Sequence, residues 1–274
     1  MKKFKLIRRL ILILIVFGLL ATGYYTYAIS PKDYQFSHYE YINQNIDSKL
    51  NGFKICFISD INLKDKNSIT RLKDTVKELN KQVFDMIIFG GDLYDDSLFS
   101  SKEVSQILKD IDCQYGKFAV LGEKDEDASQ EVTQILNDGG FEVIENETRP
   151  IYYKDTSFLL IASSYGEDIS KLANEKSDTI KINVTHQPDS FQANKDDIDL
   201  QLSGHSYGGS IYLPYIGGLI LPDGAKTYNH GLYQEEATLL VSNGFSGSSS
   251  FPYKFLAKNE INFITLRTNS SSNQ

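Results

Sequence analysis

The chain has 274 residues, with 28 basic against 36 acidic side chains and a formal net charge of −8. This acidic balance argues against a nucleic-acid-binding protein, because phosphate backbones require a basic surface. There are only two cysteines, Cys56 and Cys113, and their surroundings in the sequence do not resemble a cysteine metal site. Either a bridge between them or unpaired thiols fits the sequence.

The first segment is basic and is followed by a long uncharged run. Residues 1–9 carry five basic side chains and no acid, and residues 10–31 carry no charge at all. As a helix, Leu10–Ala28 would extend about 28 Å, enough to cross a hydrocarbon core. We predict a transmembrane anchor in residues 1–30, with the basic flank in the cytoplasm and the remainder outside. The alternatives are a cleaved signal peptide and a twin-arginine export signal at Arg8 and Arg9.

Beyond this anchor the sequence predicts one α/β domain. We expect residues 31–50 to be a polar connector, residues 51–268 to be the folded domain, and residues 269–274 to be a disordered tail. Apolar spacing of three and four residues predicts helices over Ser68–Lys81, Lys102–Ile111 and Gln130–Leu136. After Tyr152 strand patterns predominate, which indicates a second sheet within the same domain.

Five segments share one form: an apolar, strand-like run that ends abruptly in a polar residue. Parallel strands that release polar residues at their carboxyl ends build a site at one edge of a sheet. We therefore expect these five ends to meet. The segments are Phe53–Asp60, Asp85–Asp92, Lys117–Asp125, Ile180–His186 and Leu200–His205.

The polar residues at these ends resemble, in order and spacing, those of the metal-dependent, calcineurin-like phosphoesterases, and in particular the membrane-tethered bacterial branch. The family pattern is Asp-x-His, Gly-Asp-x-x-Asp, Gly-Asn-His-Asp, a lone His and Gly-His-x-His. The run GHSYGGSIYLP and residues 228–233 add to the likeness. The resemblance implies a four-layer α-β-β-α sandwich. Here the blocks read Asp60-Ile61-Asn62, Gly91-Asp92-Leu93-Tyr94-Asp95, Gly122-Glu123-Lys124-Asp125, His186 and Gly204-His205-Ser206-Tyr207.

The resemblance further implies two metal ions bridged by Asp92. The first would take Asp60, Asn62 and Tyr207, but an amide is a poorer ligand than imidazole for zinc or manganese. A phenol binds only after it loses its proton, so we expect this first site to be lost.

The second metal ion would take two imidazoles and two carboxylates, a reasonable set for Zn²⁺ or Mn²⁺. Both outcomes, one divalent ion or none, remain open from the sequence. The residues of this second set are Asp92, Glu123, His186 and His205.

Lys124 stands where the family has its catalytic histidine. A lysine is a poor proton donor near pH 7 unless burial lowers its pKa by several units. We hypothesise that its ammonium replaces the missing metal and neutralises Asp60 and Asp92.

Simpler structural roles remain open for the same residues. Asp60 and Asp92 could cap the helices that follow them, while His186 and His205 could be hydrogen-bonded residues of the core and of a loop. We interpret four further titratable residues as solvated or structural: Asp95, Asp125, His230 and His38.

The substitutions lead us to expect a membrane-anchored, extracytoplasmic protein with impaired catalysis. It would act as a binding or scaffold protein at the cell envelope, contacting membrane lipid through its anchor and an envelope ligand or protein of unknown identity. The alternative is an active hydrolase that uses one metal on a phosphate ester of an envelope lipid or polymer precursor.

Overall fold

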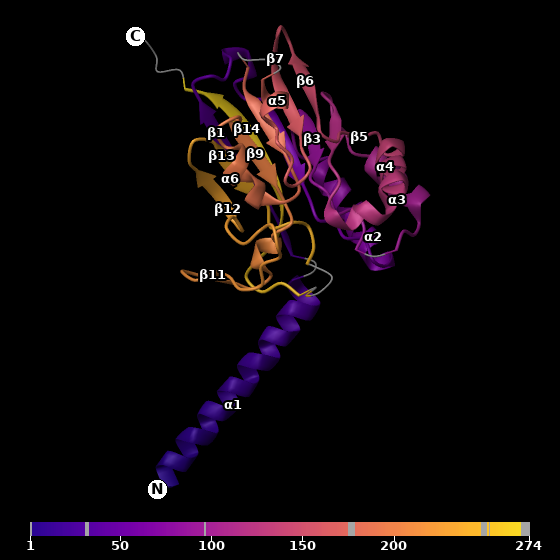
Figure 1. Cartoon of the computed structure of the whole chain (residues 1–274). Helices are drawn as coiled ribbons and strands as arrows, with labels where there is room; N and C mark the ends of the chain where they lie inside the picture. Colours follow the sequence, from indigo (N-terminus) through magenta and orange to yellow (C-terminus); the bar gives the residue numbers. More distant parts are fainter. Residues whose placement is uncertain are drawn as a thin grey trace.

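Two six-stranded sheets stack face to face in the computed structural model, which describes residues 2–30, 33–95, 97–174, 179–247, 251 and 253–269 (Figure 1). The first sheet has the order β1 (Tyr34–Asn43), β14 (Asn259–Thr268), β2 (Lys54–Ile58), β3 (Met86–Phe89), β4 (Lys117–Ala119) and β5 (Glu142–Val143). The second has the order β12 (Gly231–Gln234), β13 (Thr238–Val241), β9 (Leu200–Ser203), β8 (Lys181–Val184), β7 (Thr156–Ala162) and β6 (Glu147–Tyr153).

The central strands of each sheet run parallel. In the first sheet β2, β3, β4 and β5 are parallel, and in the second β7, β8, β9 and β13 are. Because parallel strands of one sheet end at a common edge, the segments after β2, β3 and β4 lie together, as do those after β8 and β9. The stacking of the two sheets brings these two sets into contact, as between His186 and Gly90 and between His205 and Asp60. The five predicted strands are all present, and each stops before the polar residue that drew attention to it.

Helices cover the outer faces, which gives four layers. Next to the first sheet lie α2 (Lys66–Leu79), α3 (Ser101–Lys109) and α4 (Ser129–Asp138), within a residue or two of the predicted helices. Two short helices, α5 (Ser170–Ala173) and α6 (Phe191–Asn194), pack on the second. The remaining helical turns are η1 (Tyr25–Ile29), η3 (Ser48–Leu50), η4 (Glu123–Ala128), η5 (Pro188–Ser190) and η6 (Tyr207–Gly209).

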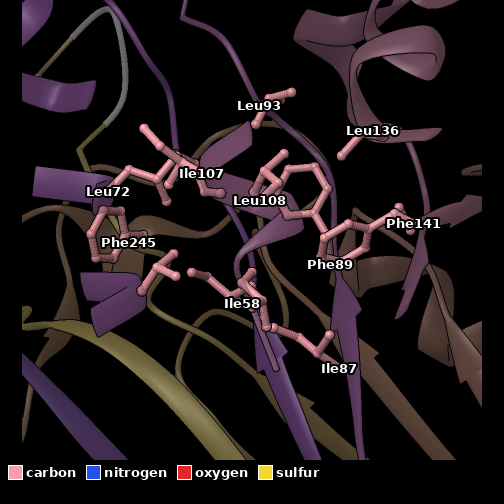
Figure 2. Close-up of a cluster of buried hydrophobic side chains, with 14 of the residues drawn as sticks. Ile58, Leu72, Ile87, Phe89, Leu93, Ile107, Leu108, Leu136, Phe141 and Phe245 are labelled. Atoms are coloured by element: carbon pink, nitrogen blue, oxygen red, sulfur yellow. The ribbon is translucent and has the colours of Figure 1, made fainter. Parts of the chain in front are cut away.

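Alternate residues of each buried strand serve different apolar layers. In β2, Ile58 packs toward the helices beside Leu72, whereas Phe57 faces the second sheet. Figure 2 shows the helix-side cluster, in which Phe89 and Leu108 lie between the sheet and its helices. Burial on both faces explains why these strands are almost wholly apolar in sequence.

The structure differs from the expected organisation in one place. Within the predicted connector, residues 34–43 form β1, which pairs in parallel with β14 along its whole length. Its polar and aromatic side chains alternate at the edge of the sheet, a weaker sequence signal than that of a buried strand.

Of the two possibilities for the cysteines, the structure shows unpaired thiols: Cys56 and Cys113 are both free. Residues 270–274 of the predicted tail lie outside the described residues.

The helix α1 (Lys2–Tyr24) projects away from the domain and continues into the π-helical turn η1 (Figure 1). Its apolar side chains are exposed, for example Leu14 and Phe17. Among the described residues, no helix combines the length and the apolar character that crossing a membrane requires.

Candidate metal centre

Residues at the strand ends are held in an uncommon backbone conformation. Of eleven non-glycine residues with positive φ in the described chain, five belong to the predicted site. Such conformations cost energy and persist where the surrounding structure requires them, often at functional sites. The five are Asp60, Asn62, Asp92, His205 and Tyr207.

Asp60, Asp92 and His186 form the tightest cluster of ligand-type side chains in the part of the chain that the structure describes. One ligand atom from each lies within 4.8 Å of the others, and all three residues are buried. His186 Nε2 lies 3.4 Å from Asp92 Oδ1 and 4.0 Å from Asp60 Oδ1. The sequence assigned Asp60 to the degraded site, but in the fold it stands beside the retained histidine.

Backbone carbonyls set the tautomers of both histidines. The Gly90 carbonyl oxygen lies 2.6 Å from His186 Nδ1, and the Asp223 carbonyl oxygen lies 2.6 Å from His205 Nε2. A carbonyl only accepts, so these two nitrogens carry the protons. In the neutral rings the lone pairs therefore reside on His186 Nε2 and His205 Nδ1.

These two nitrogens are buried and make no hydrogen bond. The imidazole rings meet edge to face with centroids 5.0 Å apart, and His205 Nδ1 lies 3.5 Å from Glu123 Oε2. Metal-binding histidines characteristically donate their other N–H to a carbonyl or carboxylate. The arrangement therefore fits one divalent metal ion held by Asp60, Asp92 and His186, with His205 next to this cluster as a further candidate ligand.

Glu123 lies at the rim of this centre. Its side chain is 41% exposed, and its carboxylate accepts a hydrogen bond from Gln187 Nε2 at 3.1 Å. It could complete the ligand set from the solvent side. Gln187 directly follows His186, but nothing in the sequence indicated that its amide would contact Glu123.

The other side of Asp92 is occupied by hydrogen-bond donors. The Tyr207 hydroxyl donates to Asp92 Oδ2 at 3.1 Å, and Lys124 Nζ lies 3.8 Å from the same oxygen. Lys124 Nζ also donates to Asn62 Oδ1 and to Asp95 Oδ1, both at 2.8 Å. A second metal does not fit here, because an ammonium and a phenol surround the oxygen that would bridge.

The charged groups in this cluster shift one another's pKa values. Burial acts to lower the pKa of His186, but Asp92 and Asp60 outweigh it and raise that pKa to about 10. Without a metal ion the ring is therefore protonated and paired with Asp92, and it would bind a metal ion in exchange for that proton. Burial acts to raise the pKa of Asp92, but His186 and Lys124 hold it well below its usual range. For His205, burial and the charge of His186 both lower the pKa, which favours the neutral, ligand-competent ring.

Tyr207 is a proton donor here. Burial and the two nearby aspartates raise the pKa of its phenol well above the ordinary value. The phenol therefore keeps its proton near neutral pH and donates a hydrogen bond to Asp92. This fits the expectation that Tyr207 is not a metal ligand.

The four titratable residues that we interpreted as solvated or structural lie in different environments. Asp95 is not a solvated residue, because its side chain is 11% exposed and binds Lys124. Asp125 is structural and fully buried, accepting hydrogen bonds from the backbone N–H groups of Asp92 and Gly122. His230 lies beside Asn243 Oδ1, and His38 stacks on Phe263 at 5.0 Å, both outside the centre.

Comparison with known proteins adds a family to this geometry. Residues 53–208 match the family model described as calcineurin-like phosphoesterase. The chain is also 30% identical over 267 residues to the uncharacterised metallophosphoesterase YkuE of Bacillus subtilis, covering 92% of each protein. The chain belongs to the calcineurin-like phosphoesterase family. This membership agrees with the resemblance seen in the sequence.

Two more distant relatives have a more specific name or a membrane location in their name. The chain is 26% identical over 189 residues to the phosphodiesterase YaeI of Escherichia coli, covering 66% of this chain and 70% of that protein. It is 23% identical over 246 residues to a transmembrane protein with a metallophosphoesterase domain from Danio rerio, covering 82% of this chain and 55% of that protein.

Proposed function

We propose that this protein is a phosphoesterase that works with a single divalent metal ion. The carrying observation is the buried cluster of Asp60, Asp92 and His186, in which one ligand atom from each residue lies within 4.8 Å of the others, with the unpartnered His205 Nδ1 next to it. A divalent metal ion would replace the proton that His186 shares with the carboxylates and would give His205 Nδ1 the partner that a buried nitrogen needs. This favours the hydrolase alternative over the impaired enzyme that the sequence first suggested.

The groups on the two sides of Asp92 would have different roles in catalysis. When bound, the metal ion would supply a Lewis acid for a phosphoryl oxygen and a bound water of lowered pKa. On the opposite side, Lys124 holds a positive charge fixed by Asn62 and Asp95. A charge positioned in advance stabilises the phosphate oxygens as negative charge develops in the transition state.

The substrate class that this arrangement supports is a phosphate ester. The relative YaeI has the name phosphodiesterase, which supports testing a diester first. We assign the natural substrate to an envelope lipid or polymer precursor, which would meet a domain held outside the membrane. The net charge of the residues after 28, 23 basic against 36 acidic, does not favour long-range attraction of polyanions.

Metal content and turnover of the purified full-length protein test this proposal. We expect about one tightly bound zinc or manganese per chain, as in other three-ligand catalytic sites, and hydrolysis of bis-(p-nitrophenyl) phosphate with added Mn²⁺. His205→Ala should lose both the metal and the activity. His38→Ala, a histidine outside the centre, should lose neither. No bound metal under saturating conditions would make hydrolysis by this site untenable.

A binding or scaffold role is the second candidate. It is favoured by the enclosure of Asp92 Oδ2 by Tyr207 and Lys124, which takes the place of a second metal. In that case the metal-loaded protein would bind a phosphate ester without turning it over. Calorimetry with a non-hydrolysable phosphonate ester, next to the turnover assay, separates the two roles.

We also propose that α1 anchors the protein in a membrane, with the domain outside the cytoplasm. This is supported by the uncharged run 10–31 after a basic flank and by the exposed apolar side chains of α1. The Danio rerio relative is named a transmembrane protein, which supports the same location.

A further inference from the structure

An uncharged hairpin follows the metal centre directly. Residues 206–222 contain no charged side chain, although charged residues make up 23% of the protein. The strands β10 (Tyr212–Leu213) and β11 (Gly217–Gly218) form its stem. At its tip Tyr215 is fully exposed and Ile216 is 71% exposed, and Leu219, which follows β11 at the base of the stem, is 50% exposed. Exposed apolar groups that cluster in this way mark an interaction surface.

The hairpin is mounted firmly on the turn that contains Tyr207. A Cβ added at Gly209 would lie 2.3 Å from the Cα of Gly218, so the two backbones touch with no side chain between them. Backbone N–H groups of Ile220 and Leu219 donate to Gly209 and Ile211 at 3.0 Å and 2.9 Å. The position of the hairpin tip is therefore coupled to that of the centre.

The same hairpin is connected to the base of α1. Phe255 links them: its carbonyl accepts from the N–H of Tyr212 at 3.0 Å, and its ring meets Tyr25 edge-on at 6.0 Å. Beside it Leu256 is 49% exposed and Tyr253 is 41% exposed. Figure 1 shows β11 at the end of the domain from which α1 leaves, with β6 and β7 toward the opposite end.

We propose that this hairpin enters the surface of a lipid bilayer. Lipid is favoured over a protein partner because the hairpin lies at the end of the domain from which α1 leaves and is linked to the base of α1 through Phe255. The exposed apolar side chains and the basic flank of α1 suit a membrane. Tyrosine suits the headgroup layer, since its ring is apolar and its hydroxyl is polar. This contact also indicates the substrate class, and here we rely on the proposed function. The substrate would be a phosphoester carried by the headgroup of a membrane lipid.

Fluorescence of an introduced tryptophan tests the contact without relying on activity. The protein has no tryptophan, so Tyr215→Trp would provide a single reporter at the hairpin tip. In full-length protein reconstituted into phosphatidylcholine–phosphatidylglycerol vesicles, we expect its emission to shift to shorter wavelength and to be quenched by lipid with a spin label near the headgroup. Tyr152→Trp is the matched control, since Tyr152 is 67% exposed on β6 toward the opposite end of the sheet. Equal quenching of the two variants would overturn the proposal.

A second variant tests the substrate class. Ile216→Asp should slow hydrolysis of a phosphoester lipid in vesicles by about tenfold or more, because a carboxylate opposes entry into the lipid surface. Hydrolysis of the soluble aryl diester should be unchanged. Equal rates on the lipid for variant and wild type would refute the lipid substrate. If neither protein cleaves the soluble diester, the proposed function fails, while the fluorescence result still decides the lipid contact.

Discussion

Asp92 is the residue around which the centre is divided. Its Oδ1 faces His186 and the position suited to a metal ion, while its Oδ2 accepts a hydrogen bond from Tyr207 and lies near Lys124. One carboxylate thus faces a site suited to a labile metal ion on one side and the covalently tethered ammonium of Lys124 on the other. The tethered charge cannot be removed by a chelator, so metal removal and lysine substitution should have separable effects.

Replacing Lys124 by methionine should lower turnover without removing the metal. The side chain keeps its length but loses the charge that Asn62 and Asp95 hold in place. Loss of one pre-positioned donor typically costs about a hundredfold to a thousandfold in kcat. Steady-state kinetics with metal analysis on the same sample would measure this, with Lys73→Met, an exposed lysine of α2, as control. Unchanged kcat would remove Lys124 from the mechanism.

The turn after β3 shows how an element positions the centre. Gly91 has φ +96°, and an added Cβ would lie 2.6 Å from Gly122 N and 2.7 Å from His186 Nδ1. Only glycine allows the loops after β3 and β4 to approach each other and the histidine this closely. The element therefore needs glycine for space as well as for conformation.

Gly91→Ala should be more destabilising than Gly166→Ala and should also reduce metal binding. Gly166 has a similar φ of +83°, but no atom lies within 4 Å of an added Cβ, so its substitution reports backbone strain alone. We expect roughly 1 kcal/mol from strain at either position and about 2 kcal/mol more at Gly91 from crowding. Denaturant unfolding of both variants measures the difference. Equal losses would show that the crowding is relieved at no cost.

At the scale of the whole molecule, a buried lysine makes the stability of the domain depend on pH. Lys254 is 2% exposed, and its Nζ donates to the carbonyls of Asn243 at 2.5 Å and Gly244 at 3.3 Å. Burial lowers its pKa to about 7, against the opposing influence of Asp60 and Glu260. The folded protein therefore releases this proton more readily than the unfolded chain does.

This difference predicts that stability rises with pH relative to Lys254→Met. Between about pH 7, the folded pKa, and about pH 10.4, the unfolded value, the unfolded chain binds more protons than the folded protein. Within this window the free energy of unfolding should increase by up to about 1.4 kcal/mol per pH unit. Guanidinium unfolding across the window tests it. Wild-type and variant curves that run parallel would contradict the assignment.

The association of the whole protein with membranes should depend on α1. Ile13→Lys combined with Phe17→Lys places two charges among exposed apolar side chains of this helix. Each charge costs about 2.5–3.5 kcal/mol near the centre of a membrane helix. We expect the double variant to move from the membrane fraction to the soluble fraction on centrifugation, with the domain still folded by circular dichroism. Retention in the membrane fraction would argue against α1 as the anchor.

The sequence by itself determined the scaffold and most members of the centre. Parallel strands in a sheet end at one edge, so polar residues at the ends of neighbouring strands were expected to meet, and Asp92, His186 and His205 could be named on that basis. The stacking of two sheets, which joins β2, β3 and β4 to β8 and β9, is a feature of the tertiary structure. The helices were predictable from the spacing of their apolar residues. The strand β1 was not, since an edge strand carries a weaker apolar pattern than a buried one.

Only the tertiary structure decided how those residues are paired. It brings Tyr207 to Asp92 across 115 positions of sequence and sets Asp95 against Lys124. The histidine tautomers depend on the carbonyls of Gly90 and Asp223. Every residue has a backbone carbonyl, so no pattern of side chains can reveal which carbonyl will accept the hydrogen bond from each histidine. Residue types indicated a metal centre, and the folded backbone decided which atoms face the metal.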